Sequence, residues 1–186
     1  GDTCLNLVLS TDSVQDLVNE IPIKGSGKKF SGTEKVVVSG SNIFSDMDEF
    51  TIEVKARLKS ISDYRPLVVN PGRYEFVVTD GHLLFNVRDD LNRDLQGSFV
   101  EISTEKTLKK NKSYVLKAVL DNEGQLSIYA DGELWAQSES AFDGRFIPQI
   151  TGNNDQNLFV GYHPGWKKWF NGEISNVVIY NKAIAP

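Results

Sequence analysis

Cysteine is nearly absent from this chain: Cys4 is the only one among 186 residues, and histidine occurs twice. A single thiol cannot close an internal disulfide, and it excludes zinc sites that are built on several cysteines. The chain also lacks any run of about 18 apolar residues, which excludes a helix that spans a membrane. Basic residues are fewer than acidic ones, 20 against 25, so the net charge is −5. Without a basic field to attract phosphate groups, nucleic acid is excluded as an expected partner.

The remaining composition is that of an ordinary globular protein, with 40% hydrophobic and 24% charged residues. A chain of this length buries about 70% of its unfolded surface when it folds, so it needs neither a disulfide nor a metal for stability. No break in composition, low-complexity tract or internal repeat divides it. We therefore expect one domain over residues 1–186.

Apolar residues recur with a period of two along much of the chain, as in strands that bury one face. Residues 50–59 are the clearest case, because Phe50, Ile52 and Val54 alternate with polar or charged neighbours. Asp-Gly pairs at 80–81 and 131–132 are strong hairpin signals, since both residue types tolerate a positive φ. Further strands are predicted over residues 5–9, 66–69, 74–78, 82–87, 98–102, 114–120, 125–129, 158–160 and 177–180. The pattern predicts an all-β fold, an antiparallel β-sandwich of the jelly-roll type.

Two details of this pattern carry further expectations. Residues 11–18 show the helix signal of the chain, one or two turns capped by Thr11 or Asp12. A two-residue turn over 131–132 would place Trp135 opposite Ile128, and the apolar neighbours on that face predict a structural role for Trp135.

The segment 157–181 (NLFVGYHPGWKKWFNGEISNVVIYN) places two of the three tryptophans in one short loop between strands, with two lysines between them. Loops on a β scaffold are where binding residues concentrate, because the scaffold supplies the rigidity. Large aromatic rings beside cations suit a polar ligand with one apolar face, such as a sugar ring. The alternative is that either tryptophan closes the end of a hydrophobic core. The predicted ligand-binding residues of the loop are Tyr162, His163, Trp166, Lys168 and Trp169.

A second polar cluster follows the predicted strand at 82–87. It contains Arg88, Asp90 and Arg93, and Tyr64 and Arg65 precede another strand that borders the same surface. These side chains are predicted to supply hydrogen bonds to the hydroxyl groups of a sugar. The alternative is a solvated loop whose charges pair with each other, since surface ion pairs are common and individually weak.

Five blocks of the sequence resemble the laminin G-like branch of the concanavalin A-like lectin/glucanase superfamily. They are FSGTEKVVV (30–38), DEFTIEVKAR (48–57), LSIYADGEL (126–134), NLFVGY (157–162) and FNGEISNVVIYNKAI (170–184). The similarity covers about residues 28–184, and the order and spacing of the blocks carry it. The chain departs from the family at a core tryptophan, replaced here by Lys55 or Ala56, and at an acidic residue, replaced here by Ser175.

The resemblance implies two curved antiparallel sheets and a secreted module that binds carbohydrate or an extracellular protein. It also implies that the binding loops cluster at one end of the sandwich. The expected localisation is extracellular, periplasmic or cell-surface. The expected partner is an oligo- or polysaccharide, with an extracellular protein as the alternative.

Some members of the family bind calcium, and Ser175 weakens the acidic set that they use. Asp12, Asp46 and Asp48 are the candidate ligands of a structural calcium, together with Asp16, and the alternative is that they are solvated acids in turns. No calcium loop of the D-x-D-x-D-G type is present. No other cofactor is expected.

Glycosidases of this superfamily carry paired carboxylates, which must stand about 5 to 9.5 Å apart. No strand places two acids at alternate positions in a favourable context, and no G-x-S-x-G nucleophile motif occurs. The expected function is therefore a non-catalytic, lectin-like carbohydrate-binding module, part of a secreted or cell-surface bacterial glycan-processing protein. The alternatives are a protein-binding adhesion module and a glycoside hydrolase of the superfamily.

Overall fold

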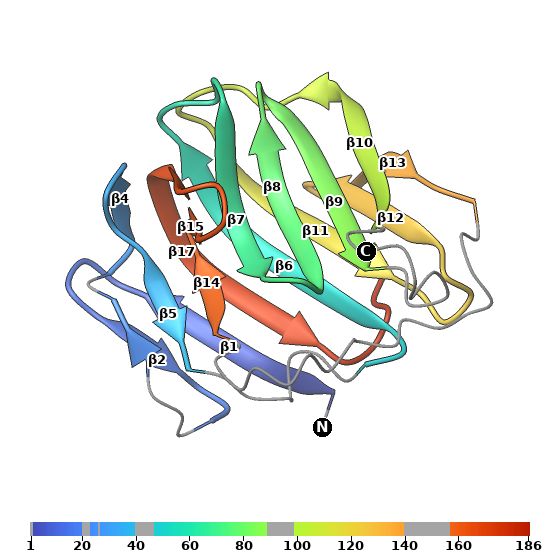
Figure 1. Cartoon of the computed structure of the whole chain (residues 1–186), viewed down its shortest axis with the longest axis horizontal. Helices are drawn as coiled ribbons and strands as arrows, with labels where there is room; N and C mark the ends of the chain where they lie inside the picture. Colours follow the sequence, from blue (N-terminus) through green and yellow to red (C-terminus); the bar gives the residue numbers. More distant parts are fainter. Residues whose placement is uncertain (1, 20–22, 26, 40–46, 89–98, 140–156) are drawn as a thin grey trace.

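The computed structural model describes residues 2–19, 23–25, 27–39, 47–88, 99–139 and 157–186. These residues form two antiparallel sheets that pack face to face, the back sheet and the front sheet of Figure 1. This confirms the predicted antiparallel β-sandwich. The described residues contain no helix, and hence none that has the length and apolarity to cross a bilayer.

The back sheet has eight strands. In spatial order they are β13 (Glu133–Gln137), β12 (Leu126–Ala130), β11 (Ser113–Leu120), β6 (Phe50–Leu58), β17 (Asn171–Tyr180), β1 (Thr3–Leu9) and β2 (Val14–Asp16), and β4 (Lys29–Ser31) also pairs with β17.

The front sheet has seven strands, and a separate two-stranded hairpin lies over it (Figure 1). In spatial order the strands are β10 (Phe99–Thr107), β9 (His82–Arg88), β8 (Tyr74–Thr79), β7 (Tyr64–Asn70), β14 (Leu158–Val160), β5 (Val36–Val38) and β3 (Ile23–Lys24). The hairpin consists of β15 (Tyr162–His163) and β16 (Lys168–Trp169).

The core lies between the sheets and follows the period-two pattern. In β6 the side chains of Phe50, Ile52 and Val54 are fully buried, whereas Lys55 on the opposite face is exposed. The Phe50 ring crosses to the front sheet, where its centroid lies 4.8 Å from that of Tyr74. Because alternate residues point to opposite faces, β8 places Glu75 on the outer face of the front sheet between the buried Tyr74 and Phe76.

The two Asp-Gly turns form as predicted. Asp80 has a φ of 47° and Asp131 a φ of 50°, the left-handed conformation that a two-residue hairpin turn requires. The first turn pairs Thr79 with His82, and the same register places Glu75 opposite Asn86 farther along β8 and β9.

Two local predictions are wrong. Residues 11–18 form no helix: β2 pairs with β1, and both oxygens of the Asp16 carboxylate accept hydrogen bonds from backbone amides. Strand pairing with an already buried neighbour satisfies this backbone better than an isolated turn of helix. The predicted pairing of Ile128 with Trp135 fails because a β-bulge shifts the register, so that Ile128 pairs with Ala136.

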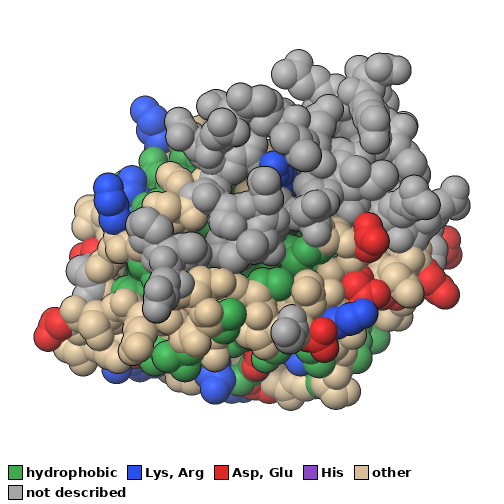
Figure 2. Space-filling view, turned by 90° about the horizontal axis from the view of Figure 1, so that it is seen from below, with side chains coloured by type: hydrophobic (Ala, Val, Ile, Leu, Met, Phe, Trp, Pro, Cys, Tyr) green, Lys and Arg blue, Asp and Glu red, His purple; other side chains and the backbone are tan. Residues whose placement is uncertain are grey.

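The surface is mixed in character. On the face shown in Figure 2, acidic, basic and hydrophobic side chains are interspersed among polar ones.

Candidate functional site

The loop that carries Trp166 and Trp169 folds into the β15–β16 hairpin. The hairpin lies over the outer face of β7, not at an end of the sandwich (Figure 1). The chain enters it through Gly161, whose amide donates to the Leu67 carbonyl at 3.0 Å. The Phe170 amide donates back to the Gly161 carbonyl at 2.9 Å. The expected clustering of binding loops at one end of the sandwich is therefore wrong for this loop, because β7 holds the hairpin against the sheet.

His163 attaches the hairpin to the sheet. Its side chain is buried, and its Nε2 lies 2.6 Å from Oε1 of Glu75 on β8. Its Nδ1 accepts hydrogen bonds from the backbone amides of Gly165 and Trp166, each at 3.1 Å. Because two donors point at Nδ1, the ring proton belongs on Nε2, from which it is donated to the carboxylate. His163 thus fixes the position of Trp166 with both of its nitrogens.

Glu75 is held as a carboxylate on the outer face of the front sheet. Burial alone would raise its pKa, but hydrogen bonds from His163, Asn86 and Tyr64 outweigh burial and bring the pKa below the ordinary value of 4.5. The Asn86 amide donates to Oε2 at 3.2 Å, and the Tyr64 hydroxyl donates to the same oxygen at 3.3 Å. Desolvation and the nearby Glu75 charge in turn raise the pKa of Tyr64, so its hydroxyl keeps the proton that it donates.

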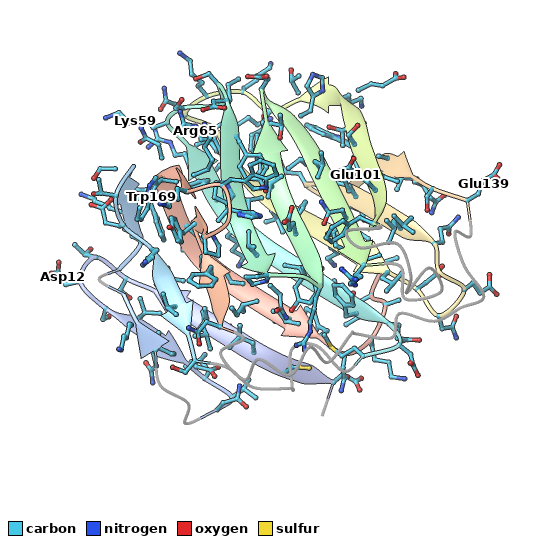
Figure 3. All side chains as sticks on the ribbon, in the orientation of Figure 1. Asp12, Lys59, Arg65, Glu101, Glu139 and Trp169 are labelled. Atoms are coloured by element: carbon cyan, nitrogen blue, oxygen red, sulfur yellow. The ribbon has the colours of Figure 1, made fainter. Side chains whose placement is uncertain are left out.

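Tyr64, Glu75 and Asn86 line a groove of about 410 Å³. Its floor is a row across three strands, since Glu75 pairs with Asn86 and Asn86 pairs with Glu101 on β10. The Trp166 ring, 67% exposed, lies at the hairpin side. Glu101 lies at the β10 side (Figure 3). The full lining is Tyr64, Glu75, Leu84, Asn86, Phe99, Glu101, Trp166 and Lys168. A flat ring with one apolar face and polar edges fits such a surface.

Three of the residues predicted from sequence line this groove: Tyr64, Trp166 and Lys168. The Lys168 ammonium lies 2.7 Å from the Asp63 carboxylate. That hydrogen bond lowers the pKa of Asp63. A fourth predicted residue, His163, does not line the groove: it contacts the lining residue Glu75, and both of its ring nitrogens are occupied by protein groups.

The two tryptophans of the loop serve different surfaces. Trp169 pairs with Tyr162 across the hairpin, and their ring centroids lie 4.2 Å apart. The Lys35 ammonium lies 4.6 Å from the centroid of Tyr162 and 5.8 Å from that of Trp169. Residues opposite each other in a hairpin share a face, so this stack is on the side away from His163. Neither ring lines the groove, so Trp166 is the one tryptophan of the loop that contributes to it.

Arg65 is a positioning residue for the hairpin. Its guanidinium donates to the carbonyl of Trp169 at 3.3 Å, to that of Ser62 at 2.8 Å and to the Ser60 hydroxyl at 3.1 Å. Figure 3 shows Arg65 and Trp169 on the same side of the front sheet, away from Glu101.

The second predicted cluster is only partly described. Arg88 is half-buried on β9, and its backbone amide donates to the Arg73 carbonyl at 2.7 Å. Asp90 and Arg93 lie outside the described residues.

The proposed calcium ligands Asp12, Asp16 and Asp48 lie on described parts of the chain. Asp12 and Asp48 are exposed, and Asp46 lies outside the described residues. Within the described ranges, no group of three or more acidic, histidine or cysteine side chains is placed to hold a metal ion.

Sequence reasoning missed five of the groove residues: Glu75, Leu84, Asn86, Phe99 and Glu101. A signal for Glu75 and Asn86 was present. Counting outward from the Asp-Gly turn at 80–81 pairs Glu75 with Asn86, and the apolar alternation assigns both to the outer face. Glu101 joins the row through the pairing of β9 with β10, and a row across strands leaves no period-two pattern of acids along any one strand.

Comparison with solved structures shows the same fold in bacterial binding domains. The binding domain of Paraclostridial Mosquitocidal Protein 1 matches with a TM-score of 0.72 and 13% identity, over 98% of this chain and 49% of that one. The botulinum neurotoxin serotype D ligand-binding domain, solved in complex with N-acetylneuraminic acid, matches with a TM-score of 0.70 and 13% identity, over 99% and 48%. A candidate carbohydrate-binding protein from Bacteroides ovatus matches with a TM-score of 0.63 and 20% identity, over 90% and 45%. The chain spans about half the length of these solved chains.

Among curated protein sequences, no match to this chain is found. A family model, by contrast, matches residues 30–186, the region that holds all five sequence blocks and the groove. The sandwich topology agrees with that match. This protein therefore belongs to the concanavalin A-like lectin/glucanases superfamily.

Proposed function

We propose that the groove on the front sheet binds an oligo- or polysaccharide and that the chain is a non-catalytic, lectin-like module. The observation that carries this proposal is the exposed Trp166 ring, held by His163 beside the polar row of Glu75, Asn86 and Glu101. An aromatic face packs on the C–H face of a pyranose, while fixed polar groups at its edge bind the hydroxyls. Because His163 attaches the hairpin to Glu75, the platform is formed before the ligand arrives, which reduces the entropic cost of binding.

The ionised state of Glu75 argues against one catalytic role, that of the general acid of a glycosidase. Glu75 and Glu101 stand two strands apart, roughly 9.5 Å between Cα atoms, a separation that on its own is compatible with an inverting glycosidase. Such an enzyme needs one carboxyl group that holds its proton until the leaving oxygen takes it. The hydrogen bonds to Glu75 lower its pKa and so favour the opposite state.

We place the module in a secreted or cell-surface bacterial protein that processes glycans. The likeness to binding domains of bacterial toxins and to the Bacteroides ovatus protein supports this setting. We propose that binding needs no cofactor, because hydrogen bonds from His163, Asn86 and Tyr64 hold Glu75 in position in the groove.

The test compares the unmodified protein with Trp166→Ala on a broad glycan array and in affinity gels that contain polysaccharides. Trp169→Phe is the matched control, because it keeps an aromatic ring against Tyr162 and lies outside the groove. Loss of a central aromatic anchor is expected to weaken retention by about tenfold or more. The control variant should be retained like the unmodified protein, and a chelator should leave retention unchanged.

Equal retention of Trp166→Ala on every bound glycan would remove the groove from the proposal. No binding to any glycan, together with retention on an extracellular protein, would favour an adhesion module. Release of reducing sugar from β-glucans would favour a glycoside hydrolase.

A further inference from the structure

The groove contains a buried hydrogen-bond acceptor that has no donor among the described residues. Asn86 is buried, with only 7% of its surface exposed. Its side-chain amide nitrogen donates to Oε2 of Glu75 at 3.2 Å. Since a carboxylate only accepts, this contact assigns the nitrogen and leaves Oδ1 on the other side of the amide. Among the described residues, Oδ1 of Asn86 is buried without a partner. A buried oxygen of this kind costs free energy until a donor arrives, so it favours a ligand that brings one.

The charged groups of the groove point to the same ligand chemistry. Asn86 lies between the carboxylates of Glu75 and Glu101 in the cross-strand row. The one cation in the described lining is Lys168, and its ammonium is already bound by Asp63 at 2.7 Å. The lining therefore presents two acids and no unengaged cation. An anionic ligand would meet repulsion without a compensating partner.

Building on the proposed glycan-binding role, we infer that the groove selects saccharides whose edge groups donate hydrogen bonds, namely neutral and amino sugars, and rejects saccharides that carry a carboxylate. A hydroxyl or ammonium group donates to Oδ1 of Asn86 and to Glu101, while the apolar face of the ring packs on Trp166. Sugars with sialic or uronic acid groups lack the donor at the acidic position and add a like charge.

The size of the effect follows from Coulomb repulsion. A ligand carboxylate about 5 Å from Glu101, in a partly solvated groove, loses about four- to fifteenfold in affinity relative to its neutral counterpart. Salt screens exposed charges, so the ratio should shrink as ionic strength rises. An amino sugar should bind at least as tightly as the neutral one.

The experiment measures binding of the full chain to three oligosaccharides with the same β-1,4 gluco backbone, which carry hydroxyl, amino or carboxylate groups. An array of neutral, amino, uronic and sialylated glycans runs beside it. Glu101→Gln is expected to narrow the ratio between neutral and carboxylate ligands several-fold. Glu105→Gln is the matched control: it removes an exposed acid from the same strand, outside the groove, and should leave the ratio unchanged.

The outcomes separate this inference from the proposed function. Suppose that Trp166→Ala weakens binding, but that the unmodified protein binds carboxylate ligands as tightly as neutral ones or more tightly. This result overturns the proposed selectivity and still supports glycan binding. If Glu101→Gln leaves the ratio of the affinities for neutral and carboxylate ligands unchanged, the selectivity is likewise overturned and glycan binding is not. Silence of the unmodified protein on the whole panel overturns glycan binding and the selectivity with it. The order amino, neutral, carboxylate, together with a narrowed ratio in Glu101→Gln, supports both.

Discussion

Replacement of His163 by phenylalanine tests whether the hairpin is held by the imidazole. Phenylalanine keeps a ring where His163 meets Tyr64 edge-on, with centroids 5.7 Å apart, so packing is largely retained. It removes the Nε2 donor to Glu75 and the Nδ1 acceptor for the amides of Gly165 and Trp166. The substitution therefore separates the polar contacts of the histidine from its volume.

The expected cost is set by Glu75, whose side chain is only 15% exposed. Loss of a hydrogen bond to a buried charged group costs about 1.5 to 3 kcal/mol. The two backbone amides lie at an exposed hairpin tip, where water replaces His163, and they add little. We expect His163→Phe to lower the free energy of unfolding by about 2 to 3 kcal/mol at neutral pH. In a double-mutant cycle with Glu75→Gln, the coupling energy between the two residues should account for most of this loss of unfolding free energy.

The loss should depend on pH in a defined direction. The pKa of Glu75 lies below 4.5 in the folded protein, so its contribution is complete above 4.5 and disappears as pH falls through the lowered pKa. In His163→Phe, Glu75 stays buried but loses the hydrogen bond from His163, its strongest donor. The pH-dependent contribution of Glu75 to stability is therefore absent from this variant. Urea denaturation should show the two proteins far apart at neutral pH and converging below 4.5.

A cost below about 0.5 kcal/mol, the range of an ordinary surface substitution, would refute this reasoning. So would a cost that is independent of pH, because the lost interaction could not then involve an ionised Glu75. Trp166 fluorescence gives a second readout, since its backbone amide loses the His163 anchor.

Two further predictions concern the backbone of the hairpin. Gly161→Ala should cost about 2 to 5 kcal/mol in urea denaturation, because its φ is 76° and a Cβ would lie 2.6 Å from the Phe30 ring. Gly32 has a φ of 98° and open space around it, so Gly32→Ala measures the cost of the backbone dihedral alone, about 1 to 3 kcal/mol. If Gly161→Ala cost no more than Gly32→Ala, a clash with Phe30 would be excluded. Lys167 has a φ of 52°, so Lys167→Gly should leave the melting temperature nearly unchanged and Lys167→Val should lower it. A valine variant as stable as the glycine variant would contradict this.

Local rules were sufficient for the sandwich. Alternation in β6 places Phe50 and Ile52 in the core because a strand points successive side chains to opposite faces. The Asp-Gly turns at 80–81 and 131–132 set their hairpins because few other residue pairs accept two positive φ angles. These signals depend only on neighbours in sequence. Where a tertiary partner competed, as at 11–18 and at the bulge beside Trp135, the local prediction failed.

The sequence on its own also determined that Trp166 belongs to a loop between strands, but not which surface that loop covers. Only the packing of the hairpin on β7 brings His163 to Glu75, residues 88 positions apart in the chain. The same packing separates Trp166 from Trp169. The pairing of β9 with β10 then adds Glu101 to the row of Glu75 and Asn86. Contacts of this kind join side chains from strands that are distant in sequence, and no local pattern encodes their distance or their shared hydrogen bonds.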